Sequence, residues 1–305
     1  MQKCMRCMND FDQQEYCPYC GRRIDLPPAD IGQLPQETIL KGRFIIGEVK
    51  ARDRIGFTYI AWDALLERSV LIREWFPYKL AERLEGQTDV KIDTGNNKKL
   101  CASLNSQFVS YAKGLCRLQT IPFLVTVYTG FEENGTAYYV MENIEGITLR
   151  QMLEMQNPLD EHTAMAISQR IRDAVKVLHD NKIIHGNLSP DNIVFGKKNE
   201  IRFLNPAWYC LDMEKIKYTV FLGRYASPSY LQKSFQPDRE MDFYSIAAIE
   251  YRMLTGEEPP GPRILGKKII PVSDFGIKVT AENEKRILKE MGAKPKGLFS
   301  ILFGR

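Results

Sequence analysis

Apolar and polar residues change their spacing along the chain, and the spacing predicts strands first and helices afterwards. Residues 41–49, K-G-R-F-I-I-G-E-V, alternate and are rich in β-forming residues, which predicts a strand. The pair Asn134-Gly135 lies between two apolar runs and predicts a tight hairpin turn. Apolar residues at helical spacing predict helices over residues 104–118, 148–154 and 160–181.

The composition is that of an ordinary soluble globular protein. The 305 residues are 44% apolar and 26% charged, enough for one large domain of two lobes or for two average domains. The net charge of +4, from 42 basic and 38 acidic residues, is too small to indicate a nucleic-acid or membrane partner. The chain lacks the run of about eighteen apolar residues that a spanning helix needs, and it lacks an apolar secretory signal. We therefore expect a cytoplasmic protein whose seven cysteines are thiols or metal ligands.

Four cysteines within the first twenty residues form two C-x-x-C pairs, Cys4 with Cys7 and Cys17 with Cys20. Each pair can form a tight turn that directs two thiolates at one ion, and two such turns give the tetrahedral site of structural zinc. Gly21 suits the left-handed residue that such turns often need. With four protein ligands no position is open for catalysis. Metal binding would supply the folding free energy of the segment, roughly 10–16 kcal/mol in zinc-finger peptides.

Other interpretations of this segment are two disulfides or a redox C-x-x-C motif, but a reducing compartment favours zinc. The segment resembles a short zinc ribbon. A role as a nucleic-acid or protein adaptor would rest on Arg6, Arg22 and Arg23, which a solvated surface explains equally well. The prolines of residues 25–37 indicate a semi-extended linker rather than a packed segment.

Residues 183–195 read I-I-H-G-N-L-S-P-D-N-I-V-F and resemble the catalytic loop of the protein kinases, H-R-D-L-x-x-x-N. His185 and Asn192 match this pattern. Gly186 stands in the place of its arginine, and Asn187 stands in the place of its catalytic aspartate. The loop thus has the frame of a kinase and an amide at the catalytic position.

The resemblance is to bacterial serine/threonine protein kinases and extends over residues 40–300. It implies an α+β, bilobal kinase-like fold over residues 39–305. The β-rich small lobe is expected at residues 39–142 and the helical large lobe at residues 146–305. A zinc ribbon at residues 1–24 and a linker at residues 25–38 would precede them.

The resemblance places the phosphate-binding loop, G-x-G-x-x-G in the family, at residues 51–56, which read A-R-D-R-I-G. Ala51 replaces the first glycine, and only Gly56 is retained. Asp53 brings a carboxylate to the place of a phosphate, which is electrostatically unfavourable for nucleotide binding.

The other nucleotide-binding positions are also altered. The lysine that binds the α- and β-phosphates aligns with Arg73, and its glutamate partner aligns with Tyr111, so the ion pair of an assembled kinase site cannot form. The alanine of the adenine pocket aligns with Leu71, whose larger side chain would fill space that the purine needs. The remaining pocket positions are the gatekeeper Met141, the hinge residues Glu142 and Ile144, and Val194.

Two catalytic positions of the large lobe have amides in place of carboxylates. Asn187 cannot accept the substrate proton, and losing a general base costs about 10²–10⁴ in rate. The metal-binding motif D-F-G aligns with Asn205, Pro206 and Ala207. A neutral amide is a poor ligand for Mg²⁺.

The structural positions are retained more often than the chemical ones. Asp242 matches the aspartate that in the family hydrogen-bonds the backbone of the catalytic loop, so we expect it to be structural together with His185 and Asn192. An ion pair of the family is replaced on both sides, by Ser229 and Leu298, which is often neutral for stability.

These positions together imply a catalytically inactive kinase homologue, a pseudokinase, without ATP or Mg²⁺. It would act in intracellular signalling by binding, scaffolding or regulating protein partners, an active kinase among them. One alternative is a weak or atypical ATP-binding kinase in which Arg73 holds a phosphate and Asn192 a metal ion. Another is a zinc-ribbon adaptor for nucleic acid or protein, with the kinase-like domain as its platform.

Overall fold

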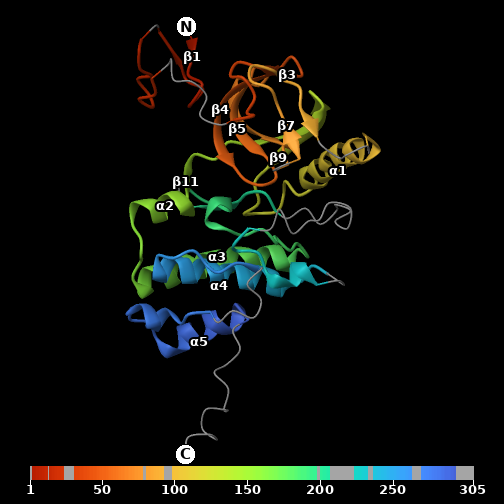
Figure 1. Ribbon diagram of the computed structural model, residues 1–305. Helices are drawn as coiled ribbons and strands as arrows, with labels where there is room; N and C mark the ends of the chain where they lie inside the picture. The colour runs from red at the N-terminus through yellow and green to blue at the C-terminus, as the bar shows by residue number, and fades with distance from the viewer. Residues whose placement is uncertain are drawn as a thin grey trace, which may run out of the picture. The chain divides into compact units, whose positions relative to one another are not determined.

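The computed structural model describes two compact units, each with its own core (Figure 1). The first takes in the described residues up to Thr120 together with Val125–Asn143, and the second takes in Ile121–Leu124 and the described residues from Ile144 onward. Among the described residues, no helix has the length and apolar character needed to cross a membrane. The structure describes residues 2–12, 14–23, 31–77, 80–92, 98–197, 200–206, 223–232, 236–262 and 269–292.

A six-stranded antiparallel sheet forms the centre of the first unit (Figure 1). Its order is β3-β4-β5-β6-β10-β9, so the chain leaves the sheet once, between β6 and β9. Asn134 and Gly135 have φ angles of 52° and 71°, and they form the two-residue turn between β9 and β10 that the sequence predicts. The strands are β3 (Ile39–Leu40), β4 (Phe44–Arg52), β5 (Phe57–Asp63), β6 (Arg68–Glu74), β9 (Val127–Glu133) and β10 (Thr136–Glu142).

Helix α1 (Lys98–Cys116) packs against β9 and β10 (Figure 1). It begins before the predicted start at residue 104. Phe108 and Ala112 are buried on it, and the Phe108 ring lies 5.3 Å from that of Tyr139 on β10. Neighbouring residues of a strand face opposite sides, so Tyr138 belongs instead to the core on the other face of the sheet.

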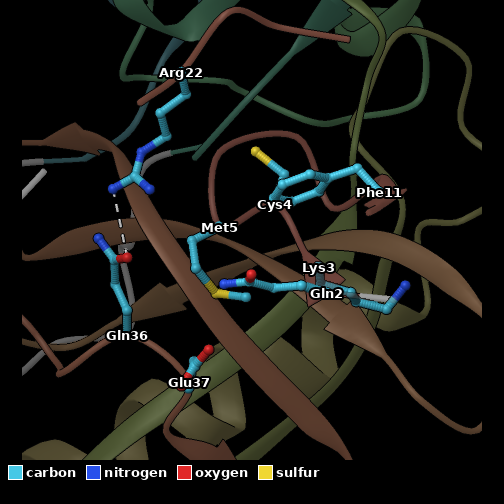
Figure 2. A pocket seen from close by; sticks show the side chains of 8 residues that line it. All are labelled: Gln2, Lys3, Cys4, Met5, Phe11, Arg22, Gln36 and Glu37. Atoms are coloured by element: carbon cyan, nitrogen blue, oxygen red, sulfur yellow. Dashed lines mark hydrogen bonds between the residues drawn. The ribbon is translucent and has the colours of Figure 1, made fainter. Parts of the chain in front are cut away.

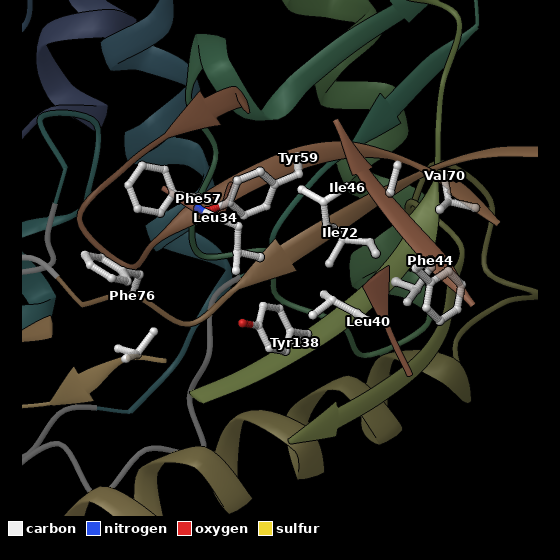
Figure 3. Packing of buried hydrophobic residues seen from close by; sticks show 13 residues of the cluster. Leu34, Leu40, Phe44, Ile46, Phe57, Tyr59, Val70, Ile72, Phe76 and Tyr138 are labelled. Carbon is white, nitrogen blue, oxygen red and sulfur yellow. The ribbon is translucent and has the colours of Figure 1, made fainter. Parts of the chain in front are cut away.

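Leu34 lies in the core on that other face of the sheet, with Leu40, Tyr59, Ile72 and Tyr138 (Figure 3). Its side chain is fully buried, and its backbone N–H donates to the Tyr59 hydroxyl at 3.0 Å. The prediction of an unpacked linker over residues 25–37 is therefore wrong at Leu34. Proline content identified irregular backbone but did not reveal that the Leu34 side chain and N–H bind that backbone to the sheet.

Two short hairpins complete the first unit. One belongs to the N-terminal segment, and its strands are β1 (Gln2–Lys3) and β2 (Asp10–Phe11). The other pairs β7 (Ala81–Glu82) with β8 (Lys91–Ile92). Between the latter two strands, Arg83 forms a buried ion pair with Glu74 and donates to the carbonyl of Gly32 at 2.7 Å.

The second unit is mainly helical, with α3 and α5 packed against α4 (Figure 1). Helix α4 (Arg239–Thr255) is buried along most of its length and ends at Gly256, whose φ of 76° suits the left-handed cap. The predicted helices at 148–154 and 160–181 are confirmed as α2 (Leu149–Met155) and α3 (Glu161–Asp180). The other elements are α5 (Ala281–Glu290), the sheet of β11 (Gly146–Thr148), β12 (Ile193–Gly196) and β13 (Ile201–Phe203), and the 3-10 turns Pro190–Asn192, Pro228–Leu231 and Val272–Phe275.

Candidate functional site

The four N-terminal cysteines lie together, with all four sulfur atoms within 4.8 Å of one another. The Sγ atoms of Cys4 and Cys20 are 3.6 Å apart, and those of Cys7 and Cys17 are 3.7 Å apart. Four sulfurs at about 2.3 Å from one tetrahedral ion would be about 3.8 Å from each other, whereas a disulfide requires about 2.05 Å. The cysteines are free thiols, and their arrangement fits a single thiophilic metal ion.

The two C-x-x-C turns have the same backbone geometry. The carbonyl of Cys4 accepts from Met8 N at 2.8 Å, and the carbonyl of Cys17 accepts from Gly21 N at 2.8 Å. The fourth residue after the first cysteine is left-handed in both turns, with φ of 60° at Met8 and 68° at Gly21. The sequence indicated this conformation for Gly21 but gave no sign of it for Met8.

Hydrogen-bond donors favour the thiolate, the form that binds metal, at Cys17, whereas burial raises the pKa of Cys4 and Cys20. Burial alone would raise the pKa of Cys17, but the backbone N–H groups of Tyr19 and Cys20 outweigh it and lower the pKa to about 7. The side-chain amide of Asn9 donates to Cys7 Sγ at 3.3 Å.

The tip of the β4–β5 hairpin, which the resemblance assigns to phosphate binding, is closed by its own aspartate. Asp53 Oδ1 accepts from the backbone N–H groups of Ile55 at 2.8 Å and Gly56 at 3.1 Å. The same carboxylate forms an ion pair with Arg73. Burial would lower the pKa of Arg73, but the charge of Asp53 raises it above its ordinary value. The donors expected to hold a phosphate therefore hold a carboxylate.

The hairpin tip also lies directly on β6. Arg73 Nη1 donates to the carbonyl of Gly56 at 3.2 Å, and Phe76 N donates to the carbonyl of Ile55 at 2.9 Å. A Cβ atom at Gly56 would lie 1.9 Å from the carbonyl oxygen of Glu74, so only glycine fits there. Gly56 is therefore explained by packing, without any ligand. Ala51 precedes the tip on β4, opposite Thr58 of β5.

Leu71 and Met141 are directly paired residues of β6 and β10, as are Arg73 and Tyr139, so the four side chains share one face of the sheet. Leu71 is 8% exposed and Met141 is fully buried. Tyr111 of α1 packs its ring edge-on against that of Tyr139, with centroids 6.2 Å apart. Tyr111, to which the resemblance assigns the place of the family's glutamate, thus packs against the Tyr139 ring.

The hinge positions fall in different units. The Glu142 carboxylate accepts from Thr126 N at 2.8 Å within the first unit. Ile144 and Val194 belong to the second unit, where Val194 lies on β12 opposite Thr148 of β11.

Three asparagine side chains form a closed ring of hydrogen bonds in the second unit. Asn187 Nδ2 donates to the carbonyl of Asn205 at 2.8 Å, and Asn205 Nδ2 donates to Asn192 Oδ1 at 3.0 Å. Asn192 Nδ2 closes the ring on the carbonyl of Asn187 at 2.8 Å. An ionised aspartate only accepts hydrogen bonds, so the ring requires amides at positions 187 and 205.

Asp242 is fully buried and binds the backbone that leads into Asn187 of this ring. Its carboxylate accepts from the N–H groups of His185 at 2.9 Å and Gly186 at 2.6 Å, and it lies 2.8 Å from His179 Nε2. Gly186 has a φ of 66°, a conformation that costs a glycine little. Burial of the His185 ring lowers its pKa to about 4.

Sequence reasoning missed the contacts of the N-terminal segment with the sheet. Arg22 forms an ion pair with Glu48 of β4, and Arg22 Nη2 donates to Gln36 Oε1 at 3.5 Å. A cavity of about 190 Å³ lies beside this contact, lined by Lys3, Cys4 and Phe11 among others (Figure 2). Arg22 and Glu48 are 26 residues apart, and no local pattern connects them.

Two predicted residues lie outside the described part of the chain, Ala207 and Leu298. Ser229, the proposed counterpart of Leu298, lies in the 3-10 turn Pro228–Leu231. Its backbone N–H donates to Ser227 Oγ at 3.2 Å, which caps that turn.

Comparison with known proteins identifies the fold. The protein kinase domain family matches residues 92–292, about two thirds of the chain. The chain belongs to the protein kinase family. It is 25% identical over 224 residues to "Serine/threonine-protein kinase PrkC" of Bacillus subtilis, covering 72% of this chain and 31% of that protein. It is 30% identical over 156 residues to "Probable serine/threonine-protein kinase zyg-1" of Caenorhabditis briggsae, covering 45% of this chain and 20% of that protein.

The solved structure "PpkA-294 apo form" matches the kinase-family chain with a TM-score of 0.68. The match covers 87% of this chain and 95% of that one at 23% identity, which shows a shared fold. The predicted kinase fold with a β-rich small lobe and a helical large lobe is confirmed. The chain spans about a third or less of the length of the two curated relatives named above.

Proposed function

We propose that the chain is a pseudokinase, a member of the protein kinase family that acts by binding other proteins and transfers no phosphate. The ring of Asn187, Asn192 and Asn205 carries this proposal. The residues at the positions assigned to the base and to both metal ligands each donate their side-chain N–H to another residue of the ring. Because such residues act as a unit in catalysis, their joint loss should leave negligible transfer.

The small lobe supports the same proposal by a different route. A triphosphate would have to displace the Asp53 carboxylate from Arg73 and from two backbone N–H groups. The bound triphosphate would also lie next to the negatively charged Asp53 carboxylate, which would repel it. An atypical kinase that uses Arg73 to hold phosphate is disfavoured because Arg73 already has a charged partner.

Thermal unfolding with and without ATP and Mg²⁺ or Mn²⁺ tests the proposal. A nucleotide present at about 100 times its Kd would stabilise the protein by about 2.7 kcal/mol, a readily measured shift. We expect no shift. A clear shift would contradict the proposal that no nucleotide binds. Transfer of labelled phosphate to a protein substrate would overturn the proposal that the chain is a pseudokinase.

We also infer that the four cysteines hold a structural Zn²⁺ ion. The sulfur donors and their spacing suit this ion, and all four positions are filled by protein, which leaves none for a reacting ligand. Thiolate zinc sites are stable in reducing compartments, which fits a cytoplasmic signalling role. Metal analysis of the purified full chain should give about one zinc per chain.

A further inference from the structure

The turns that hold the cysteines are attached to strand β4 of the small lobe by a backbone hydrogen bond. Met5 lies between Cys4 and Cys7, and its carbonyl accepts from Glu48 N at 2.7 Å. The register of β4 against β5 shifts between Ile46 and Val49, so Glu48 lies at an irregularity of the sheet. The first cysteine turn thus supplies the backbone acceptor for Glu48 N, as a neighbouring strand would do.

The two backbones approach closely at Gly47. A Cβ atom there would lie 2.3 Å from the Met5 carbonyl oxygen and 2.2 Å from Met8 Cε. Met8 is 2% exposed and is the left-handed residue of the first cysteine turn. Any residue other than glycine at position 47 would displace this turn.

The second cysteine turn is attached to Glu48 of β4 through Arg22. Arg22 follows Gly21, and its carbonyl accepts from Cys17 N at 2.8 Å. The Arg22 side chain is 4% exposed and forms the ion pair with Glu48. Both halves of the cysteine cluster therefore meet the small lobe at Glu48, and the first half also packs on Gly47.

Further contacts extend this attachment along the hairpin. Lys50 Nζ donates to the carbonyl of Arg6 at 3.3 Å, and Lys3 Nζ lies 3.5 Å from the centre of the Trp62 ring on β5. The apolar cluster of the N-terminal segment consists of Phe11 and the cysteines themselves. Without a metal ion, the two turns would have only this small cluster and their contacts with the sheet to hold them in this shape.

We propose that the four-cysteine site is a regulatory metal site of the small lobe, at which a thiophilic divalent ion, Zn²⁺, holds the base of the β4–β5 hairpin. The inference rests on the zinc site of the proposed function. From Glu48, strand β4 continues to its last residue, Arg52, and leads directly into Asp53. Loss of the ion releases the Met5 and Arg22 contacts, loosens β4 and weakens the closure of the tip by Asp53 and Arg73.

Hydrogen exchange of the full chain, zinc-loaded and after chelation, tests the proposal. Removing the ion should speed amide exchange over residues 44–63 by about tenfold or more, because a contact that closes a local opening is lost. Exchange in α3 and α4 of the large lobe should not change, and zinc content is measured on the same samples.

The Gly47→Ala variant distinguishes metal binding from the attachment of the first cysteine turn to β4. It should keep its zinc, since no ligand is altered, while exchange of β4 becomes fast with and without the ion. Gly114→Ala in α1 is the matched control, because a Cβ atom there meets nothing within 4 Å. Should Gly47→Ala fail to fold, Glu48→Gln replaces it, with Glu15→Gln of the exposed Glu15–Arg23 pair as its control.

The outcomes are distinct. A chain that binds zinc but shows the same β4 exchange with and without it would overturn the regulatory site and leave the structural zinc in place. A chain that binds no zinc would overturn both inferences about the metal, and the pseudokinase proposal would still be decided by the assay of phosphate transfer.

Discussion

The Asp53 carboxylate forms an ion pair with Arg73, whose side chain is 3% exposed while that of Asp53 is 43% exposed. The buried guanidinium of Arg73 is thus neutralised by a partly exposed carboxylate at the tip of the β4–β5 hairpin. The small lobe thus supplies the anion from its own chain. Arg73, which aligns with the family's phosphate-binding lysine, takes part in an internal ion pair instead.

Replacing Asp53 by alanine should lower the free energy of unfolding by about 1–3 kcal/mol. Removing one partner of a fully buried pair costs more, but Asp53 is partly exposed. Thermal unfolding of the variant measures the effect, with Asp89→Ala as an exposed control. Inorganic triphosphate should stabilise Asp53→Ala and leave the wild-type chain unchanged; equal responses would contradict the assignment of Asp53 as the internal anion.

Replacing Asn205 by aspartate should destabilise the large lobe by about 1–3 kcal/mol. The carboxylate cannot donate to Asn192 Oδ1, and two acceptors would then face each other. Denaturant unfolding compares it with Asn181→Asp, an exposed amide with one hydrogen bond to the Val177 carbonyl. If the two variants lose the same stability, the ring has no special role.

His185 should make stability depend on pH. Its pKa is lowered to about 4 in the folded chain, against about 6.5 when unfolded, so the unfolded state binds more protons between these values. Stability is then complete above about pH 6.5 and falls as the pH drops toward about 4, by about 3 kcal/mol in all. Unfolding measured across this range should show a shallower dependence for His185→Gln and an unaltered one for His162→Gln.

Replacing Cys7 by serine should abolish zinc binding. Serine is a poor ligand for a site built of thiolates, and three remaining cysteines leave the ion open to solvent. Metal analysis should find zinc in Cys116→Ser, whose thiol lies on α1 outside the cluster, at the level of the wild-type chain. Retention of zinc by Cys7→Ser would show that the four sulfurs do not act together.

The sequence predicted those features whose causes are local. The Asn134-Gly135 turn, the helices α2 and α3 and the two C-x-x-C turns each depend on neighbouring residues. Family resemblance located Asp53, Asn187 and Asn205 but not their partners, because hydrogen bonds between distant segments depend on the finished fold.

The attachment of the cysteine turns at Gly47 and the burial of Leu34 were missed for the same reason. Glycine in a strand indicates a close approach but does not show which segment approaches. A single leucine among prolines has no periodicity to reveal that it is buried.

Leu34 has a practical consequence for any fragment of this protein. A fragment that begins at residue 39, where the strands begin, would leave a hole the size of a leucine beneath Tyr59 and would lose the donor to its hydroxyl. Leucine-sized cavities in T4 lysozyme cost about 3–5 kcal/mol, a large share of the stability of a small domain. We therefore expect a stable kinase-family portion of this chain to begin at or before Leu34 rather than at residue 39.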